Sequence, residues 1–598
     1  MQNIDWPEIY KYEVISFDLY DTLISRIVGK PSNIFRIIGE RFNIQNFSEI
    51  RINAEKQCRE KSNNEEITLN DIYVVMSKII NINLDAVCLF ERELERNLTK
   101  INKNGYDLYK YCFEKNKKII IVSDMYLPLE DIVFILGKHK IKYNKLYLSS
   151  NIKKTKASGA MFDFVCQDLN ISKSKVLHIG DNKGSDVNVP RAKGIDAWQI
   201  FNKKSRESKQ IIDIVFNNLA ADRKYKKDSI EYIGYTAFGR LLIGFCQWLM
   251  DECKKKNIKK LYFLARDGFF IKQAFDILYP ESDLLTTYML ASRRAVSVPL
   301  INKLTSVDDI INLCKINEKD TCFEIIKKTG LEKSNLHDKF DVNKILTRDE
   351  IISFIEANNL EIVENAEFEA NDFKNYLDKI NFTGQVAIID IGWFGSMQEN
   401  IDKFCKRNKI NVNITGFYVG CRRWNKKQNR YGFAFQNQNN NERYLIDSMN
   451  PLFETFFLPN KGSLISYHSN GTFCDNEYSD NSRIILNRFQ TAAIDCVNDL
   501  SKFRIHKYCK FTASNSMEPL YRYFMAPRRG LAIQFGNIEF YDYSKKFIAK
   551  PEKIINYIYK PSSFVNDLKK CRWKIGFLTR IFGMAKLWKA LYLCSRII

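Results

Sequence analysis

Val14-Ile15-Ser16-Phe17-Asp18-Leu19-Tyr20-Asp21-Thr22-Leu23 decides the fold of the first third of the chain. In this stretch an apolar, β-prone run ends at Asp18, a short polar turn follows, and a helical pattern resumes after it. Such a pattern is typical of a buried parallel strand that brings a carboxylate to the carboxyl edge of a sheet, where α/β proteins bind ligands. Taken alone, Asp18 is a nucleophile, a metal ligand or the N-cap of a helix.

Three later segments supply partners for Asp18. The apolar run 118–122 ends at Ser123, and the run 176–180 ends at Asp181, with Asp186 five residues further on. Between these runs, Lys156 lies in a loop ahead of another helical pattern. Acids at two strand ends offer the oxygen ligands that Mg²⁺ prefers. A hydroxyl and an ammonium can hold the phosphate oxygens that the metal leaves free.

These four motifs, in this order, resemble the haloacid dehalogenase (HAD) superfamily of phosphotransferases over residues 1–201. The resemblance implies a HAD Rossmann-like domain in which Asp18 attacks phosphorus and forms an aspartyl-phosphate. It also implies that Ser123 and Lys156 hold the transferred group and that Mg²⁺ is the cofactor. The metal ligands that it implies are Asp18, the carbonyl of Tyr20, Asp181 and Asp186.

One position departs from the pattern of the family. Family phosphatases usually carry a second acid two residues after the nucleophile, as general acid and base, and this chain has Tyr20 there. Asp21, one residue later, is our candidate proton donor. The alternative is that Asp21 only caps the turn and that the domain is a weak or inactive phosphatase. Residues of about 27–110 have helical patterns and are expected to form a cap that excludes water and limits substrate size.

The composition favours a protein of several domains with a negatively charged partner. The chain has 598 residues, 45% of them hydrophobic, and a net charge of +22. Part of that excess can equally be a bias of a lysine-rich composition. The 15 cysteines are scattered without metal-ligand spacing, which indicates reduced thiols. No leader or bilayer-spanning run is recognisable, so we expect a cytoplasmic location. No basic and aromatic stripe supports nucleic acid as a partner.

A second α/β domain is expected over residues 232–470, after a linker and lead-in at 202–231. Apolar runs predict its strands. The stretch at 300–380 is charged and helix-like, which indicates an insertion. Residues 471–568 are expected to be helical or mixed. The predicted strands are 260–264, 286–290, 386–389 and 414–419.

The segment after residue 389 is the informative part of this second domain. Asp390 follows four apolar residues, and a loop with Gly392, Gly395 and Ser396 leads into a helix. Glycines let backbone N–H groups converge on an anion, and the helix dipole adds to the attraction. Arg266 and Gly268 follow an earlier strand in the same way. Two anion sites at neighbouring strand ends suggest a ligand with two separated phosphates, although an ordinary strand-loop-helix turn has the same pattern.

This region resembles the type I phosphoribosyltransferase fold. The resemblance implies that Asp390 meets the ribose hydroxyls of phosphoribosyl pyrophosphate (PRPP). It places the 5-phosphate on Gly392 to Ser396 and the pyrophosphate with Mg²⁺ on 265–268, assisted by Arg293 or Arg294. The chain departs from the family at Ile391, which stands where a second acid is usual.

Together the two domains resemble bacterial ribofuranosyltransferases of surface-polysaccharide assembly. The expected activity is phosphoribosyl transfer from PRPP to a hydroxyl of a lipid-linked glycan, followed by removal of the 5-phosphate. Asp267 and Glu454 are the candidate bases for the acceptor, and each can instead be structural. The alternative is a non-catalytic scaffold, or a phosphatase alone, in the same assembly.

The C-terminal tail, residues 569–598, carries eight Lys or Arg residues and no acid, with aromatic and aliphatic residues interleaved at near-helical spacing. We expect a basic amphipathic helix that lies on an anionic membrane. It would hold the enzyme on the inner face of the cytoplasmic membrane. The alternative is a helix that packs on the body of the protein.

Overall fold

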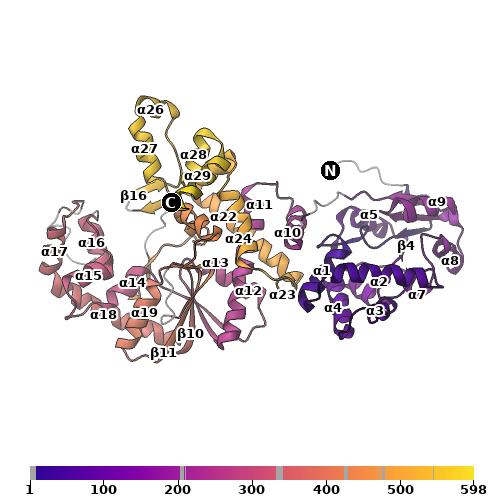
Figure 1. Ribbon diagram of the computed structural model, residues 1–598, viewed down its shortest axis with the longest axis horizontal. Helices are drawn as coiled ribbons and strands as arrows, with labels where there is room; N and C mark the ends of the chain where they lie inside the picture. The colour runs from indigo at the N-terminus through magenta and orange to yellow at the C-terminus, as the bar shows by residue number, and fades with distance from the viewer. Residues whose placement is uncertain are drawn as a thin grey trace. The chain divides into compact units, whose positions relative to one another are not determined.

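The computed structural model describes residues 8–597, except 203–207, 209, 319, 332–340, 342, 423–428, 469–470, 474–477 and 543. The chain forms two compact units (Figure 1). One comprises Met1–Arg223 with Lys502–Cys509, and the other comprises Lys224–Ser501 with Lys510–Ile598. Each unit contains a five-stranded parallel sheet, which confirms the expected α/β class.

The sheet of the first unit carries Asp18 at its carboxyl edge. Its strand order is β5-β4-β1-β6-β7, and β1 is buried at all four positions because it pairs on both sides. Counted along the chain this order is 3-2-1-4-5, so it reverses between β1 and β6, where open α/β sheets bind ligands. The strands are β1 (Val14–Phe17), β4 (Lys118–Ser123), β5 (Lys145–Leu148), β6 (Val176–Gly180) and β7 (Asp196–Gln199).

Four helices fill most of the segment expected to form a cap. A short antiparallel pair, β2 (Ile24–Arg26) and β3 (Thr99–Ile101), joins the two ends of the segment. A buried ion pair between Arg51 and Glu91, at 2.9 Å, holds the second cap helix against the fourth. The cap helices are α1 (Pro31–Phe42), α2 (Phe47–Lys61), α3 (Leu69–Met76) and α4 (Leu84–Asn97).

The sheet of the second unit has the order β12-β11-β10-β8-β9. Counted along the chain and read from β9, this order is 2-1-3-4-5, the other common doubly wound order, and it reverses between β8 and β10. Residue Ile389 of β10 is level with Phe263 of β8, so Asp390 and Asp267 both lie at this reversal. The strands are β8 (Lys260–Leu264), β9 (Leu285–Met289), β10 (Gly384–Trp393), β11 (Val412–Cys421) and β12 (Arg430–Gln436).

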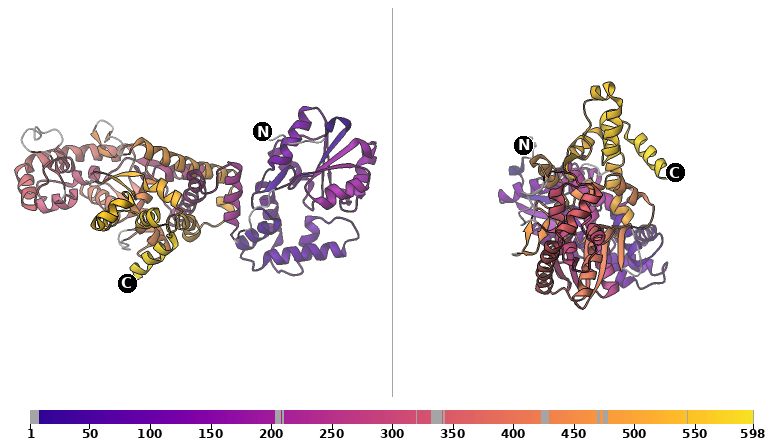
Figure 2. Two further views of the ribbon diagram at one scale, coloured as in Figure 1. Left: turned by 90° about the horizontal axis from the view of Figure 1, so that it is seen from above. Right: turned by 90° about the vertical axis from the view of Figure 1, so that its left-hand side faces the viewer.

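The stretch at 300–380 forms a helical lobe with its own apolar core, which Figures 1 and 2 place at one end of the second unit. Isoleucines such as Ile310, Ile325 and Ile355 are fully buried in this core. The helices of the lobe are α15 (Val307–Cys314), α16 (Cys322–Thr329), α17 (Arg348–Ala357) and α18 (Asn359–Lys379).

Three segments differ from what the sequence pattern predicted. Strand β10 was expected to end at Ile389 but continues to Trp393, because β11 offers backbone partners as far as Cys421. The stretch 202–231, expected to be a linker and lead-in, contains α10 (Ile211–Asp222), and Asp222 forms an ion pair with Lys100 at 2.6 Å.

The third difference lies in the C-terminal tail, which is three helices rather than one. They are the end of α27 (Pro561–Lys570), α28 (Lys574–Phe582) and α29 (Ala585–Ile597). Trp573 and Phe577 are buried, so the first half of the tail packs on the body of the second unit, as in the alternative interpretation. No helix among the described residues is long and apolar enough to cross a membrane.

Candidate active site

Three carboxylates converge at the strand-order reversal of the first unit. Asp18 follows β1, Asp181 follows β6, and Asp186 lies in the helical turn after it; each offers an oxygen within 4.8 Å of the others. The sequence predicted this group from acids that follow two different strands. Oxygen ligands at this spacing suit a hard divalent cation such as Mg²⁺.

Lys156 joins two of these acids. Its Nζ lies 2.6 Å from Oδ1 of Asp18 and 2.6 Å from Oδ1 of Asp186, and all three side chains are buried. The backbone N–H of Lys156 donates to both carboxylate oxygens of Asp124, at 2.9 and 3.0 Å, which fixes the loop. Although burial opposes it, the charges of Asp18 and Asp186 raise the pKa of Lys156, so the ammonium persists at neutral pH.

Asp186 is held by side chains of the neighbouring strands β6 and β1. Its Oδ1 lies 3.4 Å from Nε2 of His178, whose Nδ1 is 2.8 Å from Oγ of Ser16. Burial would raise the pKa of Asp186, but the hydrogen bond with His178 and the charge of Lys156 hold it below its usual range. Gly180 is required here, because a Cβ at that position would lie 2.4 Å from side-chain atoms of Asp186.

The other two acids are harder to ionise. Burial raises the pKa of Asp18 to about 7, against the attraction of Lys156. Burial and the neighbouring charges of Asp21 and Asp186 raise the pKa of Asp181 to about 6. The metal-free site is therefore in part protonated near neutrality. A divalent cation would favour the ionised forms, since it adds opposite charge at the same point.

The structure separates the roles of Tyr20 and Asp21. The hydroxyl of Tyr20 donates to Glu95 at 3.3 Å and the ring packs on Arg26, so this side chain belongs to the base of the cap. Asp21 is exposed, in the left-handed region at φ 58°. Its carbonyl accepts a hydrogen bond from Asn102 at 2.7 Å. Burial and the charge of Asp21 both contribute to the raised pKa of Asp181.

The remaining predicted residue and two unpredicted ones complete the site. Ser123 is the buried last residue of β4, next to β1 in the sheet. Thr22, which sequence reasoning missed, donates to Oδ2 of Asp18 at 3.1 Å. Asp124 was also missed, although it directly follows Ser123. Glu65 of the cap segment accepts a hydrogen bond from the N–H of Thr155 at 2.9 Å, so the cap reaches the loop that carries Lys156.

A second group of acids lies at the strand-order reversal of the second unit. Asp390 is hydrogen-bonded to Asp267, and Glu454 interacts with both through its charge. Withdrawal from solvent and the charges of Asp390 and Glu454 raise the pKa of Asp267 well above its usual range. Burial raises the pKa of Asp390 to about 6. Glu454 is oriented by Trp393 Nε1, at 2.9 Å, and by Asn450 Nδ2, at 3.0 Å.

A cavity of about 460 Å³ opens beside these acids. Asp267 and Glu454 line it together with five basic residues, a charge balance that suits an anionic ligand. The basic residues are Arg266, Arg293, Arg294, Lys327 and Lys328. Arg294 forms a paired contact with both carboxylate oxygens of Glu369, so its guanidinium serves the lobe as well as the cavity. Lys327 and Lys328 come from α16, and no sequence pattern predicted that they line this cavity.

The sequence predicted that the glycine loop after Asp390 holds the 5-phosphate, whereas the structure indicates packing roles for its glycines. Gly392, Gly395 and Ser396 are not among the residues that line the cavity. At Gly392, φ is 121° and a Cβ would lie 2.0 Å from the carbonyl oxygen of Gly420, so packing on β11 explains this glycine. Gly395 precedes α19 (Ser396–Arg407), and a Cβ there would meet Arg430 at 2.6 Å. At Gly268 a Cβ would likewise lie 2.6 Å from the carbonyl oxygen of Leu264.

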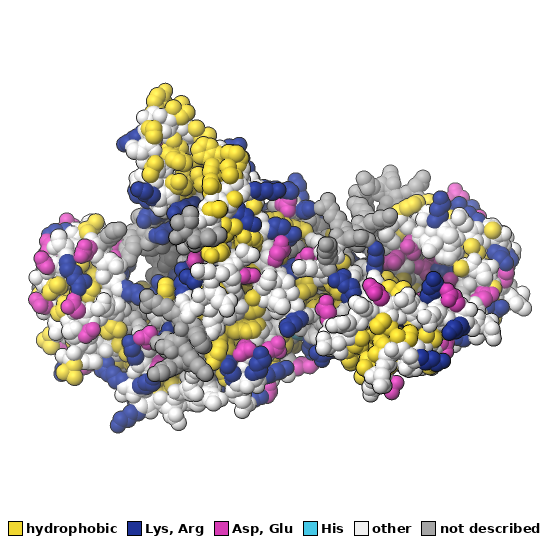
Figure 3. Space-filling view, viewed as in Figure 1, with side chains coloured by type: hydrophobic (Ala, Val, Ile, Leu, Met, Phe, Trp, Pro, Cys, Tyr) yellow, Lys and Arg dark blue, Asp and Glu magenta, His cyan; other side chains and the backbone are white. Residues whose placement is uncertain are grey.

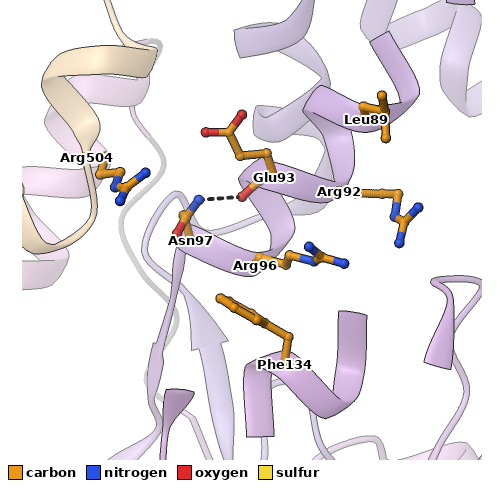
Figure 4. A pocket seen from close by; sticks show the side chains of 7 residues that line it. All are labelled: Leu89, Arg92, Glu93, Arg96, Asn97, Phe134 and Arg504. Carbon is orange, nitrogen blue, oxygen red and sulfur yellow. Dashed lines mark hydrogen bonds between the residues drawn. The ribbon is translucent and has the colours of Figure 1, made fainter. Parts of the chain in front are cut away.

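Another cavity, of about 380 Å³, lies in the first unit against α4 (Figure 4). It contains none of the residues that the motifs predicted. Two of its arginines, Arg92 and Arg96, form ion pairs with Asp131 of α6 (Leu129–Lys138). Asn97 is tied to the carbonyl of Glu93 at 3.0 Å. These contacts explain the cluster as packing between helices.

No protein-family model and no curated protein sequence matches this chain. Solved structures match about a third of it. L-2-haloacid dehalogenase from Xanthobacter autotrophicus is 9% identical over 34% of this chain and 81% of its own, with a TM-score of 0.25. A HAD family enzyme from Bacteroides thetaiotaomicron, in complex with magnesium and inorganic phosphate, is 17% identical over 33% and 97%, with a TM-score of 0.24. A HAD phosphatase from Thermococcus onnurineus is 13% identical over 33% and 90%, with a TM-score of 0.26.

Proposed function

We propose that the first unit is a Mg²⁺-dependent phosphatase of the HAD type with Asp18 as nucleophile. The observation that carries this proposal is the convergence of Asp18, Asp181 and Asp186 within 4.8 Å, with Lys156 between two of them. When bound, Mg²⁺ would neutralise charge on the phosphoryl oxygens and on the carboxylates around them.

The residues of the site divide the reaction into two steps. In the first, an oxygen of Asp18 forms a bond to phosphorus while the bond to the substrate oxygen breaks. The departing oxygen takes a proton from Asp21. In the second step water attacks phosphorus, Asp21 accepts its proton, and phosphate leaves Asp18. Lys156 and Ser123 hold the phosphoryl oxygens throughout, and Thr22 orients Asp18.

Hydrolysis of p-nitrophenyl phosphate or ribose 5-phosphate by the purified chain tests this proposal. We expect turnover with Mg²⁺, none after chelation, and none in Asp18→Asn. Turnover that survives Asp18→Asn would contradict the assignment of the nucleophile. A wild-type protein without any Mg²⁺-dependent turnover would favour the alternative of a scaffold.

We further propose that the second unit transfers a phosphoribosyl group from PRPP to a sugar hydroxyl of a surface-polysaccharide precursor. The five basic residues around the 460 Å³ cavity support binding of a ligand with two phosphate groups. In the transfer, the bond from ribose C1 to pyrophosphate breaks and a bond from C1 to the acceptor oxygen forms. Of the two candidate bases, Glu454 accepts the acceptor proton, because the raised pKa of Asp267 favours its protonated form. Carboxylates near C1 stabilise the positive charge that develops there.

The two activities form a sequence, because the transferred group carries a 5-phosphate that the first unit can remove. Incubation with PRPP and lipid-linked glycans, followed by mass spectrometry, tests the order. The wild type should add a mass of one ribosyl unit, and Asp18→Asn should add that of one phosphoribosyl unit. If PRPP is neither bound nor consumed, the transferase proposal fails while the phosphatase proposal stands. We place the enzyme at the inner face of the cytoplasmic membrane, where lipid-linked acceptors are found.

A further inference from the structure

A helical hairpin projects from the second unit with apolar residues exposed at its end. It consists of α26 (Ile554–Tyr559) and α27, and Figures 1 and 2 show α26 at its far end. Ile558 is 66% exposed and Tyr559 83%. Ile554, Ile555 and Val565 are about half exposed. Figure 3 shows this apolar surface as a continuous area that extends from the hairpin toward the body.

The inner face of the hairpin is packed, so the exposure of its outer face is not a sign of a loose segment. The hydroxyl of Tyr557 donates to Asp567 at 2.9 Å and accepts from the N–H of Glu552 at 2.8 Å. Phe564 packs edge-on against Tyr557 and also meets Phe577 of α28. The fold thus holds the outer isoleucines and Tyr559 away from the protein at a defined position.

The tail adds a second apolar strip beside the hairpin. Phe582, Met584, Leu587 and Leu591, at the end of α28 and along α29, are each about half exposed. The side chains of Trp573 and Phe577, which the amphipathic pattern also counted, are buried instead, as is that of Ile575. The available apolar surface is therefore the hairpin together with α29, and not the tail alone.

The segment that carries this apolar surface is strongly basic. Residues 545–598 contain thirteen Lys or Arg and two acids, a net charge of +11, which is half of the +22 of the whole chain. A cavity of about 580 Å³ lies at the base of the hairpin, where α27 ends and α28 begins. Its basic lining residues are Lys546, Lys569, Lys570, Arg572 and Lys574. Among the described residues of the lining the acid is Asp447, which forms ion pairs with Arg422 and Arg443.

We propose that this surface docks on an anionic lipid bilayer, with the end of the hairpin in the interface and the basic cavity over the phosphate head groups. The ten residues of α27 rise about 15 Å from the end of the hairpin to the cavity. An interfacial helix buries its apolar face ~5–10 Å into the boundary between head groups and acyl chains. The cavity then stands at the level of the head groups, where its five cations meet lipid phosphates.

Charge and shape together favour a bilayer over a protein or a nucleic acid as the partner. An apolar end with an exposed tyrosine, and a basic cavity at the base of the hairpin, match the layering of a membrane surface. Nucleic acid would use the cations but not the isoleucines. The proposal goes beyond the two proposed activities, because docking requires neither Mg²⁺ nor turnover.

Sedimentation of the full-length chain with liposomes tests the proposal. The probe is vesicles of phosphatidylcholine alone or with 30% phosphatidylglycerol, with inorganic phosphate as a competitor. We expect binding to the anionic vesicles that weakens with salt and resists millimolar phosphate. Lys569→Gln with Lys570→Gln should weaken it about 25-fold. Ile555→Ser with Ile558→Ser should weaken it at least tenfold, since about two isoleucine side chains leave the interface.

Two exposed residues outside the region provide matched controls. Lys303→Gln and Leu304→Ser, on the surface before α15, each make one substitution of the same kind and should leave liposome binding unchanged. Circular dichroism and phosphatase rates establish that each variant is folded. Equal binding by the hairpin variant and its control would overturn the proposal. So would competition by phosphate or by RNA that removes all binding, because the cations alone would then account for it.

Discussion

Replacing Lys156 by methionine should destabilise the first unit by an amount that grows with pH. The side chain is buried, and its Nζ lies 2.6 Å from both Asp18 and Asp186. Removal of one partner from a buried ion pair costs about 3–5 kcal/mol, because the other charge remains buried without compensation. We expect about 3 kcal/mol near pH 6.

The dependence on pH follows from Asp18. Its pKa in the folded protein, about 7, lies above the value of about 3.9 for an unfolded chain. Its protonation therefore stabilises the fold at low pH, and this stability is lost as the pH rises toward 7. Without the ammonium the pKa of Asp18 rises further, so the variant keeps losing stability above pH 7 while the wild type does not. The difference should grow by about 1.4 kcal/mol for each pH unit.

Hydrogen exchange followed by mass spectrometry measures this effect within the first unit. Metal-free protein is compared at pH 6 and pH 8 in increasing urea, with peptides that cover β1 and β6. A loss of ~4 kcal/mol appears as about a thousandfold rise in the opening equilibrium. Lys173→Met is the control, since its ion pair with Asp163 is partly exposed and should matter little. If the two variants behave alike at pH 8, Lys156 does not bridge two buried acids and the reasoning fails.

Three further outcomes test the sites. Gly180→Ala should lower phosphatase activity at least ~100-fold because the added Cβ displaces Asp186. The control Gly137→Ala adds a Cβ with no atom within 4 Å and should not lower it. Equal phosphatase rates in the two variants would contradict this prediction. Asp18→Asn should lower the hydrolysis rate by four or more powers of ten, about 5 kcal/mol, and normal turnover would refute it. Asp390→Ala should stop PRPP consumption yet leave hydrolysis of p-nitrophenyl phosphate intact; loss of both would mean that the variant is misfolded.

The sequence determined the elements that depend on local pattern. An apolar run that ends in an acid specifies a buried strand and the side chain at its end, since both follow from neighbours along the chain. The pattern of residues alone therefore places Asp18, Asp181 and Asp186 at one edge of a sheet. The same logic brought Asp267 and Asp390 together, although they are more than a hundred residues apart.

Tertiary structure decided what depends on contacts across the fold. Because β10 pairs with β11, the strand continues past Asp390, and Gly392 packs closely against β11. Lys327 and Lys328 line the 460 Å³ cavity of the second unit because the helical lobe folds toward it. The sequence of a helix does not show which surface the helix covers. In the tail, burial of Trp573 and Phe577 moved the exposed apolar surface to the hairpin. Burial is a property of the packed chain, and an amphipathic pattern identifies an apolar face without telling whether protein or solvent lies against it.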